Sequence, residues 1–287
     1  MTLPCPLCGS SDHPRVYGLP AYEIHRCAQC GFLYNASFRG GGGEDGTFSE
    51  TYFMVQHREA FSPLLEGIEN DPSLPVFSHR LDQIEERTAK GRLLDVGPGL
   101  GTFLRLAANR GWEVEGVEIS RFAAAQIRKQ HHLPVFEGDL LDYTGASQSF
   151  DAITFWDSLE HVARPRENLR QAFELLRPGG VLLLTTDNFD CLVADVASLL
   201  YRLSGGRLHY AVERVFIDRN LAYFTEESLA RLLREVGFEE SLREKMEYPL
   251  SKIKTNPFER LVLGGFYVWA WLLQRQAQIT VLAKRPL

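Results

Sequence analysis

Short apolar segments alternate with amphipathic ones through the last two thirds of the chain. Seven short segments are typical of strands, and most of them are rich in Val, Ile, Leu or Phe and bounded by Gly, Asp or Pro. They cover residues 92–97, 113–119, 133–139, 151–157, 181–187, a piece near 238–246, and 278–284. Helical periodicity falls between them, as at 102–110, 121–130 and 166–176, and the PGG of 178–180 predicts a turn. This alternation predicts a mostly parallel, doubly wound α/β sheet.

The first 90 residues follow a different pattern. Residues 1–36 are short strand-like pieces and turns around four cysteines, and the RGGGGEDG of 39–46 predicts a flexible connector. Residues 48–90 are helical in patches, which Pro63, Pro72 and Pro75 interrupt. We therefore expect three parts: a small domain built on the four cysteines at 1–36, a linker and helical segment at 37–90, and an α/β domain at 91–287.

Two stretches of the α/β domain, 190–220 and 250–276, are long for connections and predict lids. The second contains the apolar run LVLGGFYVWAWLL (261–273), which is too short to cross a bilayer core of about 30 Å as a helix. A buried lid or a homodimer interface is the simpler interpretation of this run. A membrane-surface contact through 257–275 is the alternative.

Composition narrows the classes of partner. The chain has 287 residues, 45% of them hydrophobic, which is enough for a large core and a small appended domain. Its net charge is −6 and no sustained run of Lys or Arg offers a basic stripe, so we expect no nucleic acid partner. The N-terminus lacks a basic region followed by an apolar one, and the cysteines stand mainly in CxxC pairs. Both features predict a cytoplasmic protein.

The cysteine spacing predicts a metal site. Cys5 and Cys8 form one CxxC pair and Cys27 and Cys30 form a second, and each pair is followed by a glycine that permits a tight turn. Four thiolates at this spacing are typical of a closed, tetrahedral zinc site with no open position for water. We therefore expect the zinc to be structural and the chemistry to lie elsewhere. Cys191 stands alone in an apolar stretch and is expected in the core.

The stretch LLDVGPGLGTF combines a strand, a glycine-rich turn and the start of a helix. Gly97, Gly99 and Gly101 let the backbone turn sharply and let a ligand approach it. Their spacing is GxGxG rather than the GxGxxG of dinucleotide sites, which favours a cofactor without a pyrophosphate. Glu118 ends the next strand, where a carboxylate can accept both hydroxyls of a ribose. Asp139 ends the following strand, where it or the neighbouring backbone can bind an adenine amino group.

Together these motifs resemble those of the class I S-adenosylmethionine-dependent methyltransferases. The resemblance rests on LLDVGPGLGTF, GVEIS, EGDLLDY, FDAITFWDSLEHVARP and LLRPGGVLLLTT, and on LAYFTEESLARLLREVGF and QITVLAKRP near the C-terminus. RCAQCGFLYN resembles the zinc-ribbon leader of a subgroup associated with polysaccharide or secondary-metabolite biosynthesis. The resemblance implies a Rossmann-like, seven-stranded sheet with the last strand antiparallel, a small N-terminal zinc ribbon, and S-adenosylmethionine as cofactor.

The resemblance also implies which residues hold the cofactor. Its methionine part would lie against the first strand and the glycine loop, its ribose against the second strand and its adenine against the third, with two more residues lining the cleft. Asp95, Gly97, Gly99 and Gly101 would hold the methionine part. Glu118 would bind the ribose and Asp139 and Leu140 the adenine, while Trp156 and Asp157 would line the cleft. Pro98 and Leu100 replace the small or polar residues usual in this loop, so we expect a stiffer turn.

Methyl transfer to a hydroxyl or a carbon acid needs a general base. His161, in LEHV beyond the fourth strand, is the first candidate, because similar enzymes use a histidine at this motif in some sugar O-methylations; orienting the loop is its alternative role. Asp187 replaces the proline common at the end of the fifth strand, and is a base, the partner of one, or an exposed turn acid. Tyr52 is a candidate pocket wall, and the HH of 131–132 predicts a solvated loop.

The sequence therefore predicts a methyltransferase for a small biosynthetic intermediate, with a sugar or related metabolite favoured and oxygen or carbon methylated. A quinone-like, polyketide-like or lipid-linked acceptor is the alternative, which the apolar run 261–273 supports. An RNA or protein methyltransferase that uses the ribbon for recognition is disfavoured, because residues 1–36 carry only Arg15 and Arg26 as firm cations. The retained Glu118 and Asp139 disfavour an inactive cofactor-binding scaffold.

Overall fold

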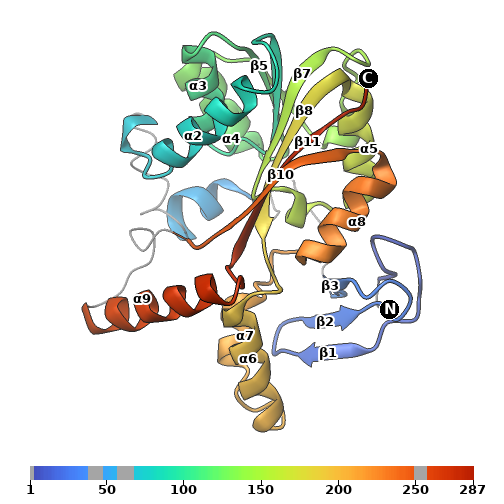
Figure 1. Ribbon diagram of the computed structural model, residues 1–287, viewed down its shortest axis with the longest axis vertical. Helices are drawn as coiled ribbons and strands as arrows, with labels where there is room; N and C mark the ends of the chain where they lie inside the picture. Colours follow the sequence, from blue (N-terminus) through green and yellow to red (C-terminus); the bar gives the residue numbers. More distant parts are fainter. Residues whose placement is uncertain (1–2, 38–47, 57–67, 249–256) are drawn as a thin grey trace.

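The computed structural model describes residues 3–37, 48–56, 68–248 and 257–287. The expected connector at 39–46, Pro63, and residues 250–256 of the second expected lid lie outside the described residues. The described chain forms a large sheet with helices on both faces and a small sheet beside its lower end (Figure 1). No described helix combines the length and the apolar character that crossing a membrane requires.

The large sheet has seven strands in the order β10-β11-β8-β7-β4-β5-β6. Strands β4 to β8 pair in parallel, whereas β11 is antiparallel to both of its neighbours, β8 and β10. The seven-stranded sheet with an antiparallel last strand is therefore confirmed. The chain moves outward from β4 to β6 and returns to β7, so a ligand crevice is expected at the carboxyl ends of β4 and β7. The strands are β4 Arg92–Val96, β5 Glu113–Glu118, β6 Val135–Glu137, β7 Phe150–Trp156, β8 Leu176–Asp187, β10 Glu239–Met246 and β11 Gln278–Lys284.

Helices cover both faces of this sheet, as the doubly wound pattern predicts. One face carries α2, α3 and α4, packed through a core that includes Leu81, Phe103 and Ile127. The other carries α5 and α8, packed through Leu169 and Leu232. The bounds are α2 Leu74–Glu85, α3 Thr102–Asn109, α4 Arg121–Gln126 with its continuation η4 Ile127–His131, α5 Pro165–Leu175 and α8 Glu226–Val236.

Three local expectations were wrong. Pro75 occupies the first turn of α2, where a missing N–H breaks no hydrogen bond, so it begins the helix instead of interrupting one. The PGG of 178–180 lies inside β8, where Gly179 has φ +79° and donates its N–H to the carbonyl of Arg285 at 2.8 Å. His131 is buried rather than solvated, and its Nε2 lies 3.1 Å from the carbonyl oxygen of Leu100 in the glycine loop.

The small sheet joins the cysteine-rich N-terminus to a distant part of the chain. Its order is β1-β2-β3-β9, all antiparallel, with β1 Arg15–Gly18, β2 Glu23–Arg26, β3 Leu33–Asn35 and β9 Ala222–Tyr223. The first three strands are those expected from residues 1–36, while β9 follows the first insertion. Tyr34 of β3 and Phe32 just before it are buried in the same core as α5 and α8, so the small sheet packs directly on the large sheet's helical layer.

The described parts of both insertions contain helices. The first contains α6 Leu192–Leu203 and α7 Tyr210–Val215, and the second contains α9 Pro257–Leu272. In Figure 1 these helices project from the end of the molecule opposite α3. Short helical turns complete the chain, η1 Tyr52–Gln56, η3 Ile68–Asn70, η5 Leu140–Asp142 and η6 Leu159–His161.

Candidate active site and metal centre

The glycine loop lies between the end of β4 and the start of α3, and its three glycines meet different demands. Each has a positive φ, +76° at Gly97, +57° at Gly99 and +87° at Gly101, which disfavours other residues. A Cβ at Gly97 would come within 2.7 Å of Ser158 Cβ, and one at Gly101 within 2.9 Å of Ile127 Cγ1. A Cβ at Gly99 would meet nothing within 4 Å. The first and third glycines therefore permit close packing, while the second faces open space that a ligand can approach.

Two buried carboxyl groups flank this loop. Asp95, within β4, is fully buried and accepts a hydrogen bond from Thr154 Oγ1 at 2.7 Å through Oδ1, whereas its Oδ2 has no partner among the described residues. Glu118 ends β5 and accepts the N–H groups of Gly99 at 2.9 Å and Ser120 at 2.8 Å. Burial raises the pKa of each carboxyl to about 7.

These groups fit the cofactor that the sequence implies. The orphaned Oδ2 of Asp95 can accept a hydrogen bond from a cationic amine such as the methionine ammonium, which would also favour its ionised form. The oxygens of Glu118 keep lone pairs for ribose hydroxyls, since each accepts one backbone N–H in the structure. The Asp95, Glu118 and glycine-loop assignments therefore agree with the local geometry, and their contacts with a cofactor stay predictions.

Three other residues expected to contact the cofactor, Asp139, Leu140 and Trp156, lie in different environments. Asp139 caps η5, accepting the N–H of Leu141 at 2.9 Å, and Leu140 is buried in the core. The ring of Trp156 packs against Phe77 and Phe103, with centroids 4.6 and 4.9 Å away, so it reaches the α2–α3 layer.

Asp157, with φ +46°, accepts two hydrogen bonds from Gln278 Nε2, at 2.9 and 3.2 Å. It belongs to a second group of carboxyls that lies where β7 and β8 end. Glu160 is 2% exposed and accepts the hydroxyl of Thr186 at 3.0 Å, and the neighbouring Asp157 and Asp187 add to burial in raising its pKa well above the usual range. Crowding of buried acids disfavours ionisation of all of them together.

Asp187 is not the exposed turn acid that was one of its expected roles. It is the last residue of β8, and its two oxygens accept hydrogen bonds from Asn220 Nδ2 at 3.0 Å and from the hydroxyl of Tyr248. Burial raises the pKa of its carboxyl. Glu160, Asn220 and Tyr248 were missed at the sequence level, because nothing in their local sequence distinguishes them and their contacts join distant segments.

His161 is held in one tautomer. Its Nδ1 lies 3.2 Å from the carbonyl oxygen of Arg219, and because a carbonyl only accepts, Nδ1 carries the proton and Nε2 keeps its lone pair. Burial lowers the pKa of His161 to about 4, so the imidazole is neutral at physiological pH. A neutral ring with an available Nε2 is the form that a general base requires.

An aromatic cluster contains this histidine together with Phe48 and Tyr52, and the guanidinium of Arg219 packs on it. The ring centroids of Phe48 and His161 are 5.1 Å apart, those of Phe48 and Tyr52 are 5.2 Å apart, and the guanidinium of Arg219 lies 5.1 Å above Tyr52. The same segment packs Phe53 against Leu100 of the glycine loop. Tyr52 was expected near the pocket, whereas Phe48 and Arg219 were not.

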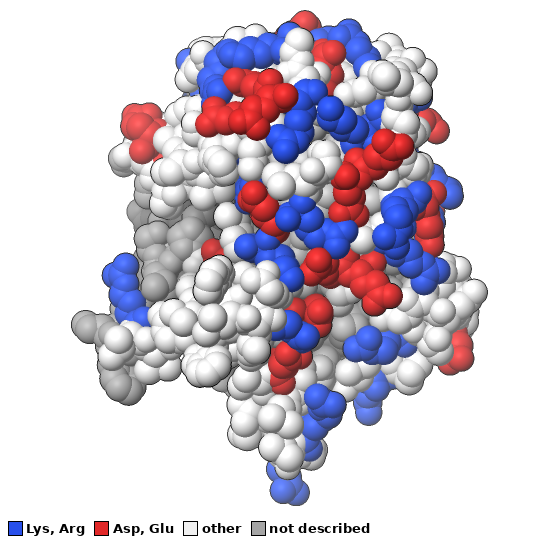
Figure 2. Space-filling view, viewed as in Figure 1, with Lys and Arg blue, Asp and Glu red and all other residues white. Residues whose placement is uncertain are grey.

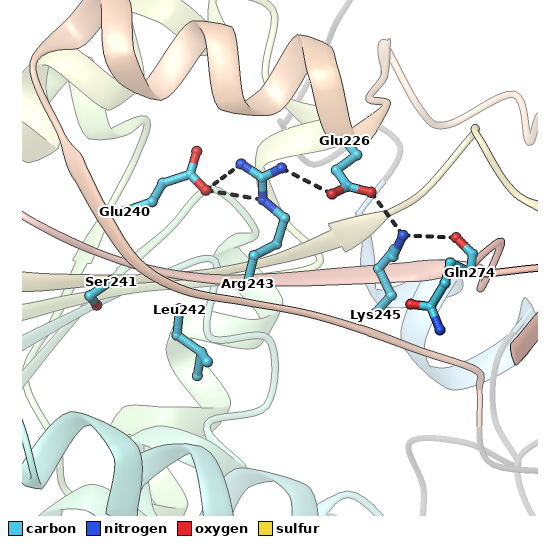
Figure 3. Close-up of a pocket in the computed structure, with 7 residues that line it drawn as sticks. All are labelled: Glu226, Glu240, Ser241, Leu242, Arg243, Lys245 and Gln274. Atoms are coloured by element: carbon cyan, nitrogen blue, oxygen red, sulfur yellow. Dashed lines mark hydrogen bonds and ion pairs between the residues drawn. The ribbon is translucent and has the colours of Figure 1, made fainter.

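The hollow drawn in Figure 3 is not part of this site. It lies on β10, at the edge of the large sheet, and its charged groups satisfy one another: Arg243 binds Glu240 and Glu226, and Lys245 binds Glu226 and the carbonyl of Gln274. No charge is left for a ligand among these pairs. Charged side chains on an edge strand are a common protection against strand-to-strand aggregation.

The four cysteines of the N-terminal pairs converge as predicted. Their sulfur atoms all lie within 4.8 Å of one another, with 3.6 Å between Cys5 and Cys30 and 3.4 Å between Cys8 and Cys27. Four sulfurs about 2.3 Å from a tetrahedral zinc ion would be about 3.8 Å apart, so the cluster fits zinc closely. Gly9, with φ +73°, returns its N–H to the carbonyl of Cys5 at 2.8 Å, and Gly31 repeats this arrangement with Cys27 at 2.9 Å. Cys191 lies in the core near α6, as expected.

Comparison with known proteins identifies the class. Residues 74–240 match the family model described as a methyltransferase domain. Ubiquinone biosynthesis O-methyltransferase of Saccharophagus degradans is 32% identical over 120 residues, covering 38% of this chain and half of the relative's length. The enzyme of that name from Aromatoleum aromaticum is 28% identical over 187 residues, covering 61% of this chain and 76% of the relative.

Solved structures share the fold. An S-adenosylmethionine-dependent methyltransferase of Archaeoglobus fulgidus aligns with TM-score 0.54 and 19% identity over 75% of this chain and 95% of that one. Phosphoethanolamine N-methyltransferase 2 of Haemonchus contortus aligns with TM-score 0.60 and 19% identity over 89% and 62%. The fold and site define a Rossmann-like enzyme of the S-adenosylmethionine-dependent class. The chain belongs to the methyltransferase-domain family.

Replacing one zinc ligand tests the structural role of the metal centre. We expect Cys5→Ser to lose bound zinc and to lower the melting temperature by about 5–10 °C, corresponding to about 2–4 kcal/mol in a chain of this size. Zinc content by mass spectrometry and thermal melting measure the two effects. Cys191→Ser, which removes a buried thiol outside the cluster, is the matched control and should keep its zinc. A zinc-free variant that keeps wild-type stability would contradict a structural role.

The ribose role of Glu118 is tested by calorimetric binding of S-adenosylhomocysteine. We expect Glu118→Ala to weaken binding by about 1–3 kcal/mol, the cost of removing a buried hydrogen-bond partner. Glu174→Ala, at an exposed position on α5, is the control and should bind like the wild type. Unchanged affinity in Glu118→Ala would remove this residue from the cofactor site.

Proposed function

We propose that the protein transfers the methyl group of S-adenosylmethionine to a hydroxyl oxygen of a quinone-like, phenolic acceptor. The observation that carries the proposal is the neutral, oriented His161 within a cluster of aromatic side chains. A hydroxyl is a poor nucleophile until its proton is removed, and a planar ring packs well against aromatic walls. The cluster combines these two properties at one place.

The cofactor supplies a sulfonium-bound methyl group, which needs a nucleophile placed in line about 3–3.5 Å away. His161 accepts the hydroxyl proton at Nε2 while the Arg219 carbonyl holds its Nδ1–H, so the ring keeps its orientation when it becomes charged. The oxygen's electron pair would form the new C–O bond, and the pair of the breaking C–S bond would remain on sulfur. The proton on His161 then leaves to solvent, which balances the reaction.

Arg219 and the aromatic rings support the acceptor's developing charge. The guanidinium is held over Tyr52, and its Nε has no partner among the described residues. A cation at this position stabilises a phenolate and favours loss of the hydroxyl proton. Phe48 and Tyr52 would flank the acceptor ring.

Asp187 acts in this proposal as a positioning residue, which replaces its expected role as a second base. Both oxygens of its carboxyl are already bound, one by Asn220 and the other by Tyr248, which suits a residue that positions its neighbours. Its bond to Asn220 fixes the chain next to Arg219, whose carbonyl orients His161.

The curated relatives support a quinone-like acceptor over the sugar that the sequence favoured. Both relatives carry names from ubiquinone biosynthesis, and they are 32% and 28% identical over 38% and 61% of this chain. Methylation of RNA or protein has no comparable support. The ribbon that would recognise such a substrate packs instead on α6 and on the large domain.

A panel of acceptors tests the proposal. With labelled S-adenosylmethionine, we expect methyl transfer to a catechol or hydroquinone that carries an apolar tail, and none to a nucleotide sugar of similar size. Mass spectrometry of the product should locate the methyl group on oxygen. Transfer to the sugar alone would overturn the acceptor class, while confirmed binding of S-adenosylhomocysteine without transfer to any phenol would exclude these acceptors.

The proposed base is tested by His161→Gln, which keeps a polar side chain of similar reach. We expect kcat to fall by about 10²–10⁴, the usual contribution of a general base, with S-adenosylhomocysteine affinity unchanged. Because the pKa of His161 is about 4, its titration should leave kcat/KM unaffected between about pH 5 and pH 8. An acid limb near the ordinary histidine pKa of about 6.5 that disappears in the variant would contradict the buried, neutral state of the ring.

A further inference from the structure

Two helical projections expose large apolar side chains to solvent. We call them the apolar arms: residues 196–210 of α6 and the turn before α7, and residues 261–273 of α9 and its end. Leu199, Leu203 and Leu208 of the first arm are 51%, 76% and 57% exposed, and Leu261, Trp269 and Trp271 of the second are 75%, 62% and 62% exposed. Single exposed apolar residues are ordinary, but a concentration of this kind marks an interaction surface.

The second arm is apolar around most of its circumference. No charged residue stands between Arg260 and Arg275, and within that stretch only Ala270 is fully buried. A helix with this pattern normally lies inside a core or in contact with lipid. The described part of the chain provides no core for it, since α9 projects sideways from the molecule in Figure 1.

A set of contacts fixes the arms to each other at their bases. The guanidinium of Arg275, just after α9, binds Asp190 at 2.9 Å and Asp195 at 2.5 Å at the start of α6. Leu192 donates its N–H to the carbonyl of Arg275 at 2.9 Å. The two arms therefore leave the molecule from one rigid base and present their apolar surfaces at the same end of it.

The charged side chains within the arms have one sign. The chain has 37 acidic and 31 basic residues, yet no acidic residue occurs in 196–212 or in 261–277. Arg202 and Arg207 are exposed on the first arm, and no carboxylate of the described residues pairs with either. Figure 2 shows the lower projection as uncharged surface with basic side chains toward its tip.

We propose that the apolar arms dock the protein on the surface of a lipid bilayer with anionic head groups. Leucine side chains enter the boundary between head groups and acyl chains, exposed tryptophans prefer that boundary, and arginines at the tip attract anionic lipid. A second copy of the chain fits less well. A two-fold contact would bring the same unpaired arginines together without any acidic partner on the arms.

The bases of the arms coincide with the candidate acceptor site. The first arm follows the end of β8 and the second precedes β11, and Asp187 pairs in register with Gln278 where these strands meet. A docked molecule would therefore hold the edge that carries Asp157 and Asp187 close to the bilayer. The docking proposal does not depend on which acceptor the site takes.

Vesicle binding without cofactor or acceptor tests the inference apart from the proposed function. We expect the full chain to float with phosphatidylcholine–phosphatidylglycerol vesicles and to bind pure phosphatidylcholine about tenfold more weakly. Tryptophan emission should shift to the blue on binding. Because Trp112 is 4% exposed and Trp156 packs in the core, the shift reports on Trp269 and Trp271.

Variants of the two arms separate apolar from charge contributions. Trp269→Ser with Trp271→Ser should abolish the emission shift and weaken binding to both vesicle types by at least about tenfold. Arg202→Glu with Arg207→Glu should weaken binding about tenfold on anionic vesicles alone. Arg170→Glu, at an exposed position on α5, is the control for added negative charge and should bind like the wild type. Thermal melting and S-adenosylhomocysteine binding confirm that each variant is folded.

Two results would overturn the inference. One is a wild-type protein that binds neither vesicle type while it still binds S-adenosylhomocysteine. The other is a stable dimer in sedimentation that becomes a monomer in the Trp269→Ser, Trp271→Ser variant, because the arms would then be a subunit interface.

Discussion

The segment that returns from the first insertion, Arg219 to Tyr223, is the connection on which the site depends. Leu221 accepts the N–H of Asn35 at 3.0 Å through its carbonyl and donates its own N–H to the carbonyl of Glu160 at 2.8 Å. One residue thus joins the small sheet to the loop that carries His161. On either side of it, Arg219 orients His161, and Ala222 and Tyr223 form β9. Few side chains in this region can move independently, because the backbone that holds them is hydrogen bonded on both sides.

This arrangement connects the cysteine cluster to a candidate site from which it is separate. Strands of three or four residues are marginal by themselves, and the two cysteine pairs fix the loops that bring β1, β2 and β3 together. The resulting sheet supports β9 on one side. On another it supports α6, where the hydroxyls of Tyr17 and Ser198 are 2.6 Å apart. Zinc at the cysteines would therefore stabilise both the aromatic cluster and the first apolar arm through intervening backbone.

The sequence predicted the elements whose identity depends on local pattern. Most of the seven strands are short segments rich in apolar residues, and the spacing of Asp95, the glycines and Glu118 follows directly from the strand–turn–helix order. The sequence did not predict the contacts between distant segments. His161 meets the Arg219 carbonyl across 58 positions, and Asp187 meets Tyr248 across 61. Periodicity also cannot distinguish an apolar helix that is buried from one that is exposed, which is why the environment of 261–273 required the structure.

The carboxyl edge of the sheet is where this chain departs furthest from what folding alone would favour. Asp95, Glu118 and Glu160 are buried with raised pKa values, and burying an acid costs free energy unless it is neutral or paired. Apolar residues of similar size would serve the core better at each position. Asp95 and Glu118 lie near the ends of β4 and β5, and Glu160 lies in the turn η6 beyond β7, where the polar parts of a cofactor and an acceptor would lie. A bound cation or hydroxyl would offset part of their cost. Their concentration at this one edge is typical of a functional site.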